Sequence, residues 1–475
     1  MPEIKAFRAW RYNPGMVKKL GSVYAPPYDV ISKAGQEKLY RASPFNVIRL
    51  ELGKEKKGDS AAKNKYTRAA AYLNDWKTER VLIQEDEPAL YVYLQDYVEE
   101  GKPAGGGSAS GGKKARIGFF AAMRLDEKSV LKHENTLAAP KKDRLALLKE
   151  VRTNLSPVFG LFEDKKGTVH TQLKKSLKQR PIVDVILDGV RHRLFVETRS
   201  DVIVPVLQAM RSKPMFIADG HHRFEVACQF RDWVKAQGFC AAGAEYALVY
   251  FADSEHNPFK IFPTHRLVRL AKKNVSLPDI LKKYGSLEKA RNLEAVLRYL
   301  SKNREETRDK KYNFGIYTKK DGFYIFTLDP GRSGLKKYFA NGGASFVDKL
   351  DVAVLHRFLI EPCFGIRSIE KSDAIDFTRD AKEAVEKVRK TDFDAAIFLR
   401  PTSLKEMMLA SKKGLKMPQK STYFYPKLLS GLVFHSLEEK KEACCCHDPA
   451  TFFATQGVAG AHGAPQRGRR KKVAG

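Results

Sequence analysis

The sequence predicts an α+β protein with mixed sheets and flanking helices. Strand-like and helix-like apolar patterns are already mixed within the first hundred residues. Short apolar runs that are typical of buried strands recur further along the chain, and a long stretch with helical spacing occupies part of the second half. At 475 residues the chain is long enough to bury a sizeable core and to form two or three domains or subdomains.

The first hundred residues are expected to contain two strands, Val47–Leu52 and Ala89–Gln95, and one helix, Ala61–Glu79. A Gly/Ser-rich segment, residues 99–114, then separates two strand-like runs, Leu90–Val98 and Arg116–Met123. We interpret this segment as an enlarged hairpin connection with a flexible, low-complexity sequence.

The middle of the chain contains a strand, a turn and a helix in direct succession. Met215–Ala218 is a short apolar run, Asp219-Gly220 is a turn signal, and Phe224–Trp233 has helical spacing without Gly or Pro. Other elements are expected as a helix at Asp143–Thr153 and as strands at Val158–Phe162 and Tyr246–Ala252.

The expected organisation is a family-like region, residues 1–437, and a disordered tail, residues 438–475. Within the first region we expect a core at residues 1–265, a Lys-rich and largely helical subdomain at 266–346, and a C-terminal part at 347–437. The tail is set apart by its Glu-Lys repeats, three adjacent cysteines and Gly/Ala/Arg-rich sequence.

The composition indicates a soluble cytoplasmic protein. There is no run of eighteen apolar residues and no secretory signal, and six cysteines without metal-ligand spacing suit a reducing compartment. The net charge of +31 favours anionic partners, but only Arg467–Lys472 forms a compact basic cluster. A nucleic-acid partner therefore stays open but is less favoured than a small anionic ligand, no membrane partner is expected, and the oligomeric state is undetermined.

Five groups that bind phosphate or move protons lie where the central strand turns into the helix, in the sequence Asp219-Gly-His-His-Arg-Phe-Glu225. Gly220 permits a positive φ and close approach of a ligand, and the free N–H groups of the helix start form an anion site. Arg223 can grip phosphate oxygens, and His221 or His222 can donate a hydrogen bond or shuttle a proton. Asp219 is a candidate metal ligand or an orienter of a histidine.

Further candidate residues lie in five other segments. Asp29 follows two prolines on a rigid turn and is a candidate general base. The remaining candidates are His133 and Glu134, Arg144 at a helix start, His265 and Arg266 after an apolar segment, and Lys420, Ser421 and Thr422 beside three aromatic residues. Each of these segments also has an ordinary structural interpretation as a turn, a cap or a packed side chain.

Seven segments, taken in order, resemble the prokaryotic family catalogued as domain of unknown function 1015. They are PPYDVI at Pro26, HENT at His133, KKDR at Lys141, NLSPVFGLF at Asn154, ADGHHRFEVA at Ala218, PTHR at Pro263 and MPQKSTYFYPKLLSGLVF at Met417. The chain departs from the family in the Gly/Ser insertion near Gly105 and in the tail after Leu437. The family implies no general activity.

The segment Asp219–Arg223 is also similar to the signature of the ParB/sulfiredoxin superfamily, which includes free-serine kinases. This resemblance implies a strand-loop-helix unit that binds nucleotide phosphates, with Asp219, His221, His222 and Arg223 as phosphate or metal contacts. The acidic catalytic residue of the serine kinases has no clear counterpart, and Asp29 and Glu51 are the candidates.

The leading hypothesis is a phosphotransferase that uses ATP or ADP with Mg²⁺, CTP being the other nucleotide considered, and acts on a small hydroxylated metabolite such as a free amino acid. One alternative is a ParB-like nucleic-acid-binding protein or nuclease with a nucleotide switch, although no helix-turn-helix signature stands out. A second alternative is a regulatory protein that binds a ligand without turnover.

Overall fold

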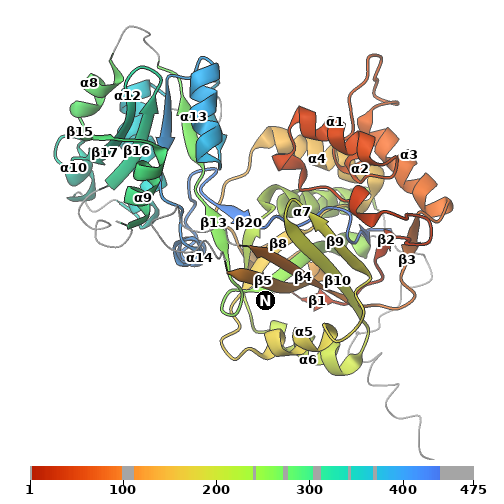
Figure 1. Ribbon diagram of the computed structural model, residues 1–475. Coiled ribbons are helices and arrows are strands. Elements are labelled where there is room, and N and C mark those ends of the chain that lie inside the picture. The colour runs from red at the N-terminus through yellow and green to blue at the C-terminus, as the bar shows by residue number, and fades with distance from the viewer. Residues whose placement is uncertain are drawn as a thin grey trace, which may run out of the picture.

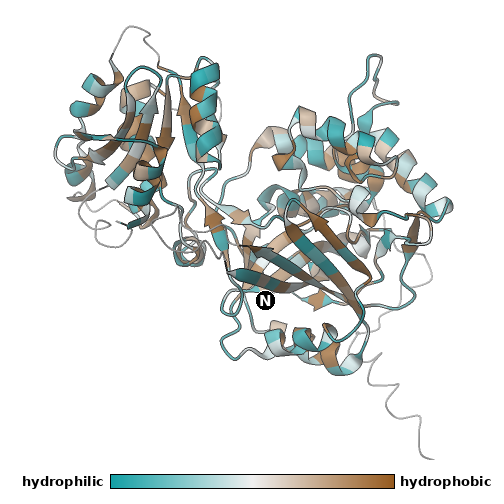
Figure 2. Cartoon of the chain, viewed as in Figure 1, coloured by the Kyte–Doolittle hydropathy of each residue, from teal (hydrophilic) through white to brown (hydrophobic). Residues whose placement is uncertain are grey.

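The computed structural model describes residues 3–98, 112–238, 242–270, 276–302, 312–340, 344–366 and 372–438. These residues form a larger lobe around a nine-stranded sheet and a smaller lobe around a six-stranded sheet (Figure 1). Apolar residues gather on the strands of both sheets, while the outer helices carry polar faces (Figure 2). The predicted α+β class with mixed sheets and flanking helices is confirmed.

The large sheet has the strand order β6-β11-β8-β12-β5-β4-β10-β9, with β1 paired to β5. Its strands are β1 (Ile4–Lys5), β4 (Leu90–Val98), β5 (Lys113–Arg124), β6 (Val130–Leu131), β8 (Val158–Phe162), β9 (Val183–Leu187), β10 (Val190–Glu197), β11 (Met215–Asp219) and β12 (Tyr246–Asp253). β4 and β5 pair antiparallel with Tyr91 opposite Phe120, so the expected pairing across residues 99–114 is confirmed. That connection itself lies almost entirely outside the described residues.

Alternation along the strands gives the large sheet two packed faces. Tyr91 and Tyr93 point into one core with α3 (Lys65–Thr78) and α4 (Ala138–Val151), whereas Val92 points into a second core with α5 (Thr168–Ser176) and α6 (Ser200–Met210). The helix α7 (His221–Ala236) follows β11 and packs beside α4.

One predicted strand is wrong, because Val47–Leu52 contains the short helix α2 (Ile48–Glu51). The side-chain oxygen of Asn46 accepts a hydrogen bond from the Ile48 N–H at 2.9 Å and so starts a helical turn. Ile48 and Leu50 are fully buried, and a short apolar run of this kind does not distinguish a buried turn of helix from a strand.

The smaller lobe is built on a sheet with the order β15-β17-β16-β19-β14-β18. Its strands are β14 (His265–Val268), β15 (Gly285–Ala290), β16 (Tyr312–Thr318), β17 (Gly322–Leu328), β18 (Ile375–Thr378) and β19 (Ala395–Phe398). Its helices include α8 (Leu277–Lys282), α9 (Leu293–Lys302), α10 (Leu335–Ala340), α11 (Asp351–Leu355), α12 (Glu361–Phe364) and α13 (Ala381–Lys390).

The boundaries expected in the second half of the chain need correction. Residues 266–346 are not largely helical, because they supply the strands β15, β16 and β17. The boundary expected after residue 346 also cuts through one sheet, since β16 pairs with β19, for example Ile316 with Ile397. The lysines suggested helices, but among these three strands only β15 contains one, Lys289, and the other described lysines of this stretch lie in the helices and turns around the strands. The tail, residues 439–475, lies outside the described part.

The chain crosses between the lobes twice, at β13 (Lys260–Phe262) and β20 (Tyr423–Tyr425), which pair antiparallel. After β20 the chain returns to the larger lobe, where β21 (His435–Ser436) pairs with β7 (Thr153–Asn154). The remaining elements are β2 (Trp10–Tyr12), β3 (Leu82–Gln84), α1 (Lys33–Ala42) and α14 (Leu404–Lys412). In the described parts of the chain, every helix is too short or too polar to cross a lipid bilayer.

Candidate functional site

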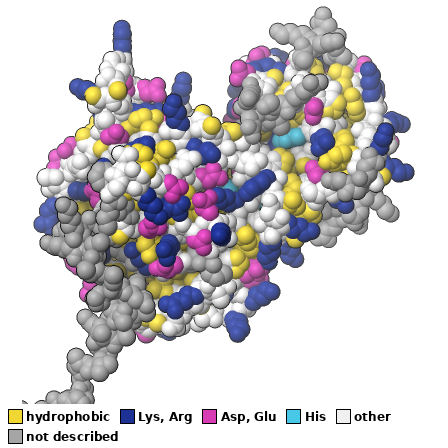
Figure 3. All heavy atoms as spheres, turned by 180° about the vertical axis from the view of Figure 1, so that it is seen from behind, with side chains coloured by type: hydrophobic (Ala, Val, Ile, Leu, Met, Phe, Trp, Pro, Cys, Tyr) yellow, Lys and Arg dark blue, Asp and Glu magenta, His cyan; other side chains and the backbone are white. Residues whose placement is uncertain are grey.

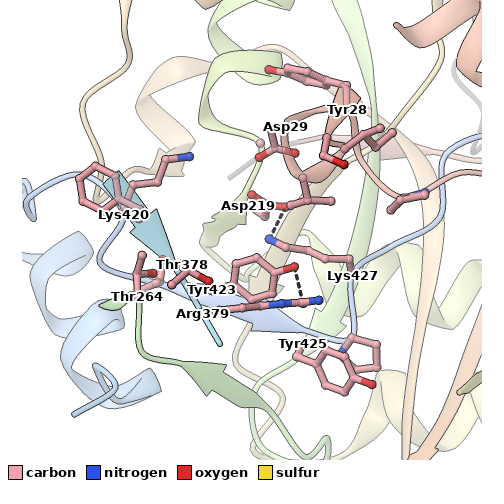
Figure 4. Close-up of a pocket in the computed structure, with 18 of the residues that line it drawn as sticks. Tyr28, Asp29, Asp219, Thr264, Thr378, Arg379, Lys420, Tyr423, Tyr425 and Lys427 are labelled. Carbon is pink, nitrogen blue, oxygen red and sulfur yellow. Dashed lines mark hydrogen bonds and ion pairs between the residues drawn. The ribbon is translucent and has the colours of Figure 1, made fainter. Parts of the chain in front are cut away.

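A cavity of about 710 Å³ lies where the two lobes meet. Both lobes and the crossing strand β20 contribute to its wall, and Figure 4 shows the side chains that converge on it. Its charged lining residues are Asp29, Glu134, Asp188, Asp219, Asp376, Arg223, Arg379, Lys387, Lys420 and Lys427. Of the residues predicted from the sequence, the cavity wall contains Asp29, Glu134, Asp219, Gly220, His221, His222, Arg223, Lys420 and Thr422.

The start of α7 opens into this cavity. Gly220 has a φ of 90° and precedes the first residue of the helix, and no side chain caps the helix start. Asp219 therefore does not cap α7, and the first N–H groups of a 16-residue helix stay available to a ligand. The side chain of Arg223 folds back over Gly220, where an added Cβ atom would lie 2.9 Å from the Arg223 Nε.

Asp219 is held between two cations. Its Oδ2 lies 3.2 Å from the Lys427 Nζ and 3.5 Å from an Arg223 terminal nitrogen (Figure 4). Burial acts to raise the pKa of the Asp219 carboxyl, but Lys427 and Arg223 outweigh burial and hold this pKa well below its usual range. Arg223 also donates a hydrogen bond to the Pro157 carbonyl, which fixes the direction of its guanidinium. Asp219 is thus an anion at neutral pH.

His222 and Glu225 anchor the loop that carries His133 and Glu134. The Leu137 N–H donates to the His222 Nε2 at 2.9 Å, so this nitrogen is unprotonated. Burial, with Lys420 nearby, lowers the pKa of His222. Glu225 accepts hydrogen bonds from the Thr136 hydroxyl and from the Lys141 Nζ at 3.1 Å, and it does not line the cavity.

His133, Glu134 and His221 form a compact cluster at the base of the cavity. The two imidazole rings meet edge to face with centroids 4.5 Å apart, and one ligand atom from each of the three residues lies within 4.8 Å of the others. Burial lowers the pKa of His133 to about 3 and that of His221 well below its usual value. Burial raises the pKa of Glu134 to about 7. These residue types in this spacing are able to hold a metal ion.

Asp29 and Asp219 both line the cavity, and they appear next to each other in the view of Figure 4. Asp29 lies in a single 3₁₀ turn, Tyr28–Val30, that follows Pro27. Arg144 does not line this cavity, because its guanidinium stacks on Tyr28 at 4.3 Å. Arg144 also donates to the Glu51 backbone carbonyl at 2.6 Å and so connects Tyr28 of this turn to α2.

The C-terminal crossing segment supplies Lys420, Thr422, Tyr423 and Lys427 to the cavity wall. Ser421 points away, because its hydroxyl donates to the Pro418 carbonyl. The Tyr423 ring carries Lys427 over its face at 4.2 Å, and burial raises the pKa of the Tyr423 hydroxyl to about 12.

The smaller lobe contributes Arg379, whose guanidinium donates to the Tyr423 hydroxyl at 2.5 Å (Figure 4). Sequence reasoning missed Arg379, Lys387 and Lys427. In a chain with 86 Lys and Arg residues, the sequence around a single basic residue does not indicate that it lines a cavity.

His265 and Arg266 begin β14 and are buried rather than exposed to the cavity. The Arg266 guanidinium donates to the Thr264 carbonyl and, at 3.1 Å, to the His356 Nε2. Burial lowers the pKa of Arg266 to about 9. Thr264 does line the cavity, and the hydrogen bond from Arg266 holds the Thr264 backbone in place.

Comparison with solved structures gives weak likenesses. A mutant free serine kinase in complex with AMP has a TM-score of 0.30 and 11% identity, over 65% of this chain and 87% of that chain. SbnI with a C-terminal truncation, from Staphylococcus aureus, has a TM-score of 0.34 and 11% identity, over 71% and 93% of the two chains. A conserved hypothetical protein from Pyrococcus furiosus has a TM-score of 0.31 and 12% identity, over 66% and 94%. Likenesses this weak do not bear on function.

The family comparison is more decisive. No curated protein matches the sequence. The family described as "Protein of unknown function (DUF1015)" matches residues 4–353, which is most of the chain and includes the segments at Asp29, Glu134 and Asp219. The predicted membership is confirmed, and this chain belongs to the DUF1015 family.

Proposed function

We propose that this protein is a nucleotide-dependent phosphotransferase that uses ATP or ADP with Mg²⁺ and acts on a small hydroxylated metabolite, such as a free amino acid. The observation that carries the proposal is the uncapped start of α7, which opens into a cavity between two lobes beside Arg223 and two carboxylates. Phosphoryl transfer depends on positioning and charge neutralisation more than on unusual side chains.

The phosphate groups would lie against the start of α7. The backbone N–H groups after Gly220 and the guanidinium of Arg223 provide donors, and the positive end of the helix dipole adds to them. Lys427, beside Asp219, and Lys420 supply further positive charge to the cavity wall. An anionic Asp219 would hold the Mg²⁺ ion that accompanies the nucleotide, exchanging its contact with Lys427 for the metal.

The acceptor would lie between Asp29 and the smaller lobe. Asp29 is exposed to the cavity and is the group proposed to accept the hydroxyl proton. Arg379 and Lys387 lie on the wall that the smaller lobe contributes, and Asp188 and Asp376 are also present. A wall with both signs of charge suits an acceptor that carries both an ammonium and a carboxylate group, as a free amino acid does.

Replacing Arg223 by Ala tests the phosphate site. We expect thermal stabilisation by ATP or ADP with Mg²⁺ in the wild type and a Kd increased about tenfold or more in Arg223→Ala, because a charge-assisted contact to phosphate is lost. Lys235→Ala is the matched control, since Lys235 belongs to the same helix and is 60% exposed in a pair with Glu245. CTP and GTP belong in the same thermal-shift screen. Unchanged nucleotide binding by Arg223→Ala would contradict the assignment of the phosphate site to Arg223.

Turnover separates the proposal from its alternatives. Incubation with ATP, Mg²⁺ and a panel of free amino acids should release ADP only with the correct acceptor, whereas stabilisation without product would indicate a regulatory ligand-binding protein. A nucleic-acid function would appear as salt-dependent DNA binding that survives removal of the tail. On the face shown in Figure 3, Lys and Arg side chains are interspersed with Asp and Glu.

A further inference from the structure

The cluster of His133, Glu134 and His221 brings together two segments that are far apart in the sequence. His133 and Glu134 follow the strand β6, and His221 is the first residue of α7. The His133 N–H donates to the His221 Nε2 at 3.4 Å, which ties the loop to the helix start. Two histidines at this separation form no sequence motif, so the pairing of His133 with Glu134 alone gave no sign of a metal site.

The cluster contains one buried imidazole nitrogen that no described group of the protein satisfies. His133 is 1% exposed, and its Nδ1 has no hydrogen-bond partner among the described residues. Glu134 forms no ion pair with a Lys or Arg side chain of the described part, although the charge of Lys420 and a hydrogen bond from its backbone N–H act to lower the pKa of Glu134 against the effect of burial. A buried imidazole nitrogen without a partner is costly unless a ligand satisfies it, and a buried carboxylate that pairs with no cationic side chain adds to that cost.

A second cluster in the same chain lacks this property. His170, Asp253 and His256 also have ligand atoms within 4.8 Å of one another. There, however, the Asp253 carboxylate accepts from both imidazoles, at 3.2 Å and 2.9 Å, and from the Asn257 side chain at 2.8 Å. The protein satisfies that carboxylate without an ion, so the cluster serves as an internal comparison.

We propose that His133, Glu134 and His221 bind a divalent transition-metal ion of the zinc type, with its remaining coordination positions open to the cavity. Two imidazoles and one carboxylate are ligands that zinc and its neighbours prefer over Mg²⁺, which takes oxygen ligands. Glu134 and His221 line the cavity, so an ion at this point is within reach of a bound substrate. Three protein ligands with an open position are typical of catalytic rather than structural zinc sites.

This ion would be distinct from the Mg²⁺ that accompanies the nucleotide. A role of the zinc-type ion in phosphoryl transfer rests on the proposed function, whereas the binding of the ion to His133, Glu134 and His221 does not depend on it. Metal binding is therefore measured without nucleotide, so that failure of one proposal is not mistaken for failure of the other.

The test uses full-length protein without a polyhistidine tag, stripped of metal with a chelator. The tail contains Cys444, Cys445, Cys446 and His447, which themselves attract zinc, so all variants carry C444S, C445S and C446S. Zinc is titrated by calorimetry, and Co²⁺ is added in parallel as a spectroscopic probe. Glu134→Gln keeps the shape of the side chain and removes its charge, His221→Ala removes an imidazole, and His256→Ala in the second cluster is the control.

We expect one equivalent of Zn²⁺ to bind the cysteine-free background, and we expect affinity to fall about tenfold or more in Glu134→Gln and in His221→Ala. His256→Ala should bind as the background does. Co²⁺ should give a visible spectrum without thiolate charge-transfer bands. Saturable binding that is unchanged in Glu134→Gln, binding lost only in His256→Ala, or the absence of binding to a background protein with a normal melting transition would each overturn the proposal. Arg223→Ala should retain zinc affinity, which separates this site from the nucleotide site.

Discussion

Asp219 and Lys427 are 208 residues apart in the sequence and meet at 3.2 Å in the cavity wall. Their side chains are 23% and 13% exposed, so the pair is largely removed from water. Lys427 and Arg223 keep Asp219 ionised although burial favours the neutral acid. The pair therefore links the crossing segment to the larger lobe and keeps a negative charge beside the start of α7.

Replacing Lys427 by Met should lower the free energy of unfolding by about 1–3 kcal/mol at pH 7, because a mostly buried carboxylate loses a partner. The pKa of Asp219 is depressed in the folded state, so its contribution is present above the unfolded pKa of about 4 and is lost as the pH falls below that value. Urea denaturation at about pH 7 and about pH 3 should show a difference between wild type and variant that shrinks in acid.

Lys412→Met is the control for this prediction, since Lys412 pairs with Glu163 at 2.9 Å with 45% and 28% of the two side chains exposed. A pair this exposed is worth less than about 1 kcal/mol. If Lys427→Met proved as mild as Lys412→Met, the ion pair would not be what holds Asp219 in its charged form.

The junction of β11 and α7 was predictable because its signal is local. An apolar run, a turn glycine and helical spacing follow one another directly, and the structure places β11, Gly220 and α7 in that order. α2 was not predictable in the same way, since its apolar residues are buried by neighbouring elements rather than arranged with a clear period. The strands of the smaller lobe were missed because the lysines that suggested a polar helix lie mostly in the helices and turns between them, and among the strands of this sheet only β15 contains a lysine, Lys289.

Gly220→Ala should weaken nucleotide binding by displacing Arg223 as well as by straining the backbone. Gly220 and Gly238 bracket α7 and have φ values of 90° and 72°, so Ala costs about 1–2 kcal/mol of stability at either position. Only at Gly220 would the added Cβ meet Arg223, whereas no atom lies within 4 Å at Gly238. Thermal unfolding should show similar losses in the two variants, and nucleotide titration should show weaker binding in Gly220→Ala alone. If Gly220→Ala and Gly238→Ala bound nucleotide equally well, the conformation of Gly220 would have no part in nucleotide binding.

The cavity as a whole depends on contacts between segments that no local pattern reports. Asp29, Glu134, Asp219 and Lys420 were selected from separate motifs, and the two lobes bring them to one cavity. Arg379 was missed because it reaches the cavity only through the pairing of β18 with β14 and the crossing of β20 beside it. Local sequence thus indicated several residues that line the cavity, while the wall from the smaller lobe required the tertiary structure.

The two lobes also enclose several neutral histidines, and this should make the whole molecule sensitive to mild acid. Burial lowers the pKa to about 3 for His265 and His435 and to about 4 for His192, against about 6.5 in an unfolded chain. Below pH 6.5 the unfolded chain binds protons that the folded chain excludes, so stability falls as the pH decreases towards those lower values. Each such group contributes up to about 1.4 kcal/mol per pH unit.

Glu134 acts in the opposite direction, because its raised pKa favours the folded state as the pH falls from about 7 to about 4. Several histidines outweigh this one carboxyl, so chemical denaturation at about pH 7.5, 6 and 5 should show a net loss of stability. His435→Leu is the test variant. His435 lies on β21, packs against Phe7 and does not line the cavity. The stability of the variant should decline less steeply with pH, by about one proton's contribution. Parallel declines in wild type and variant would mean that His435 is protonated in the folded protein and that its burial does not exclude the charge.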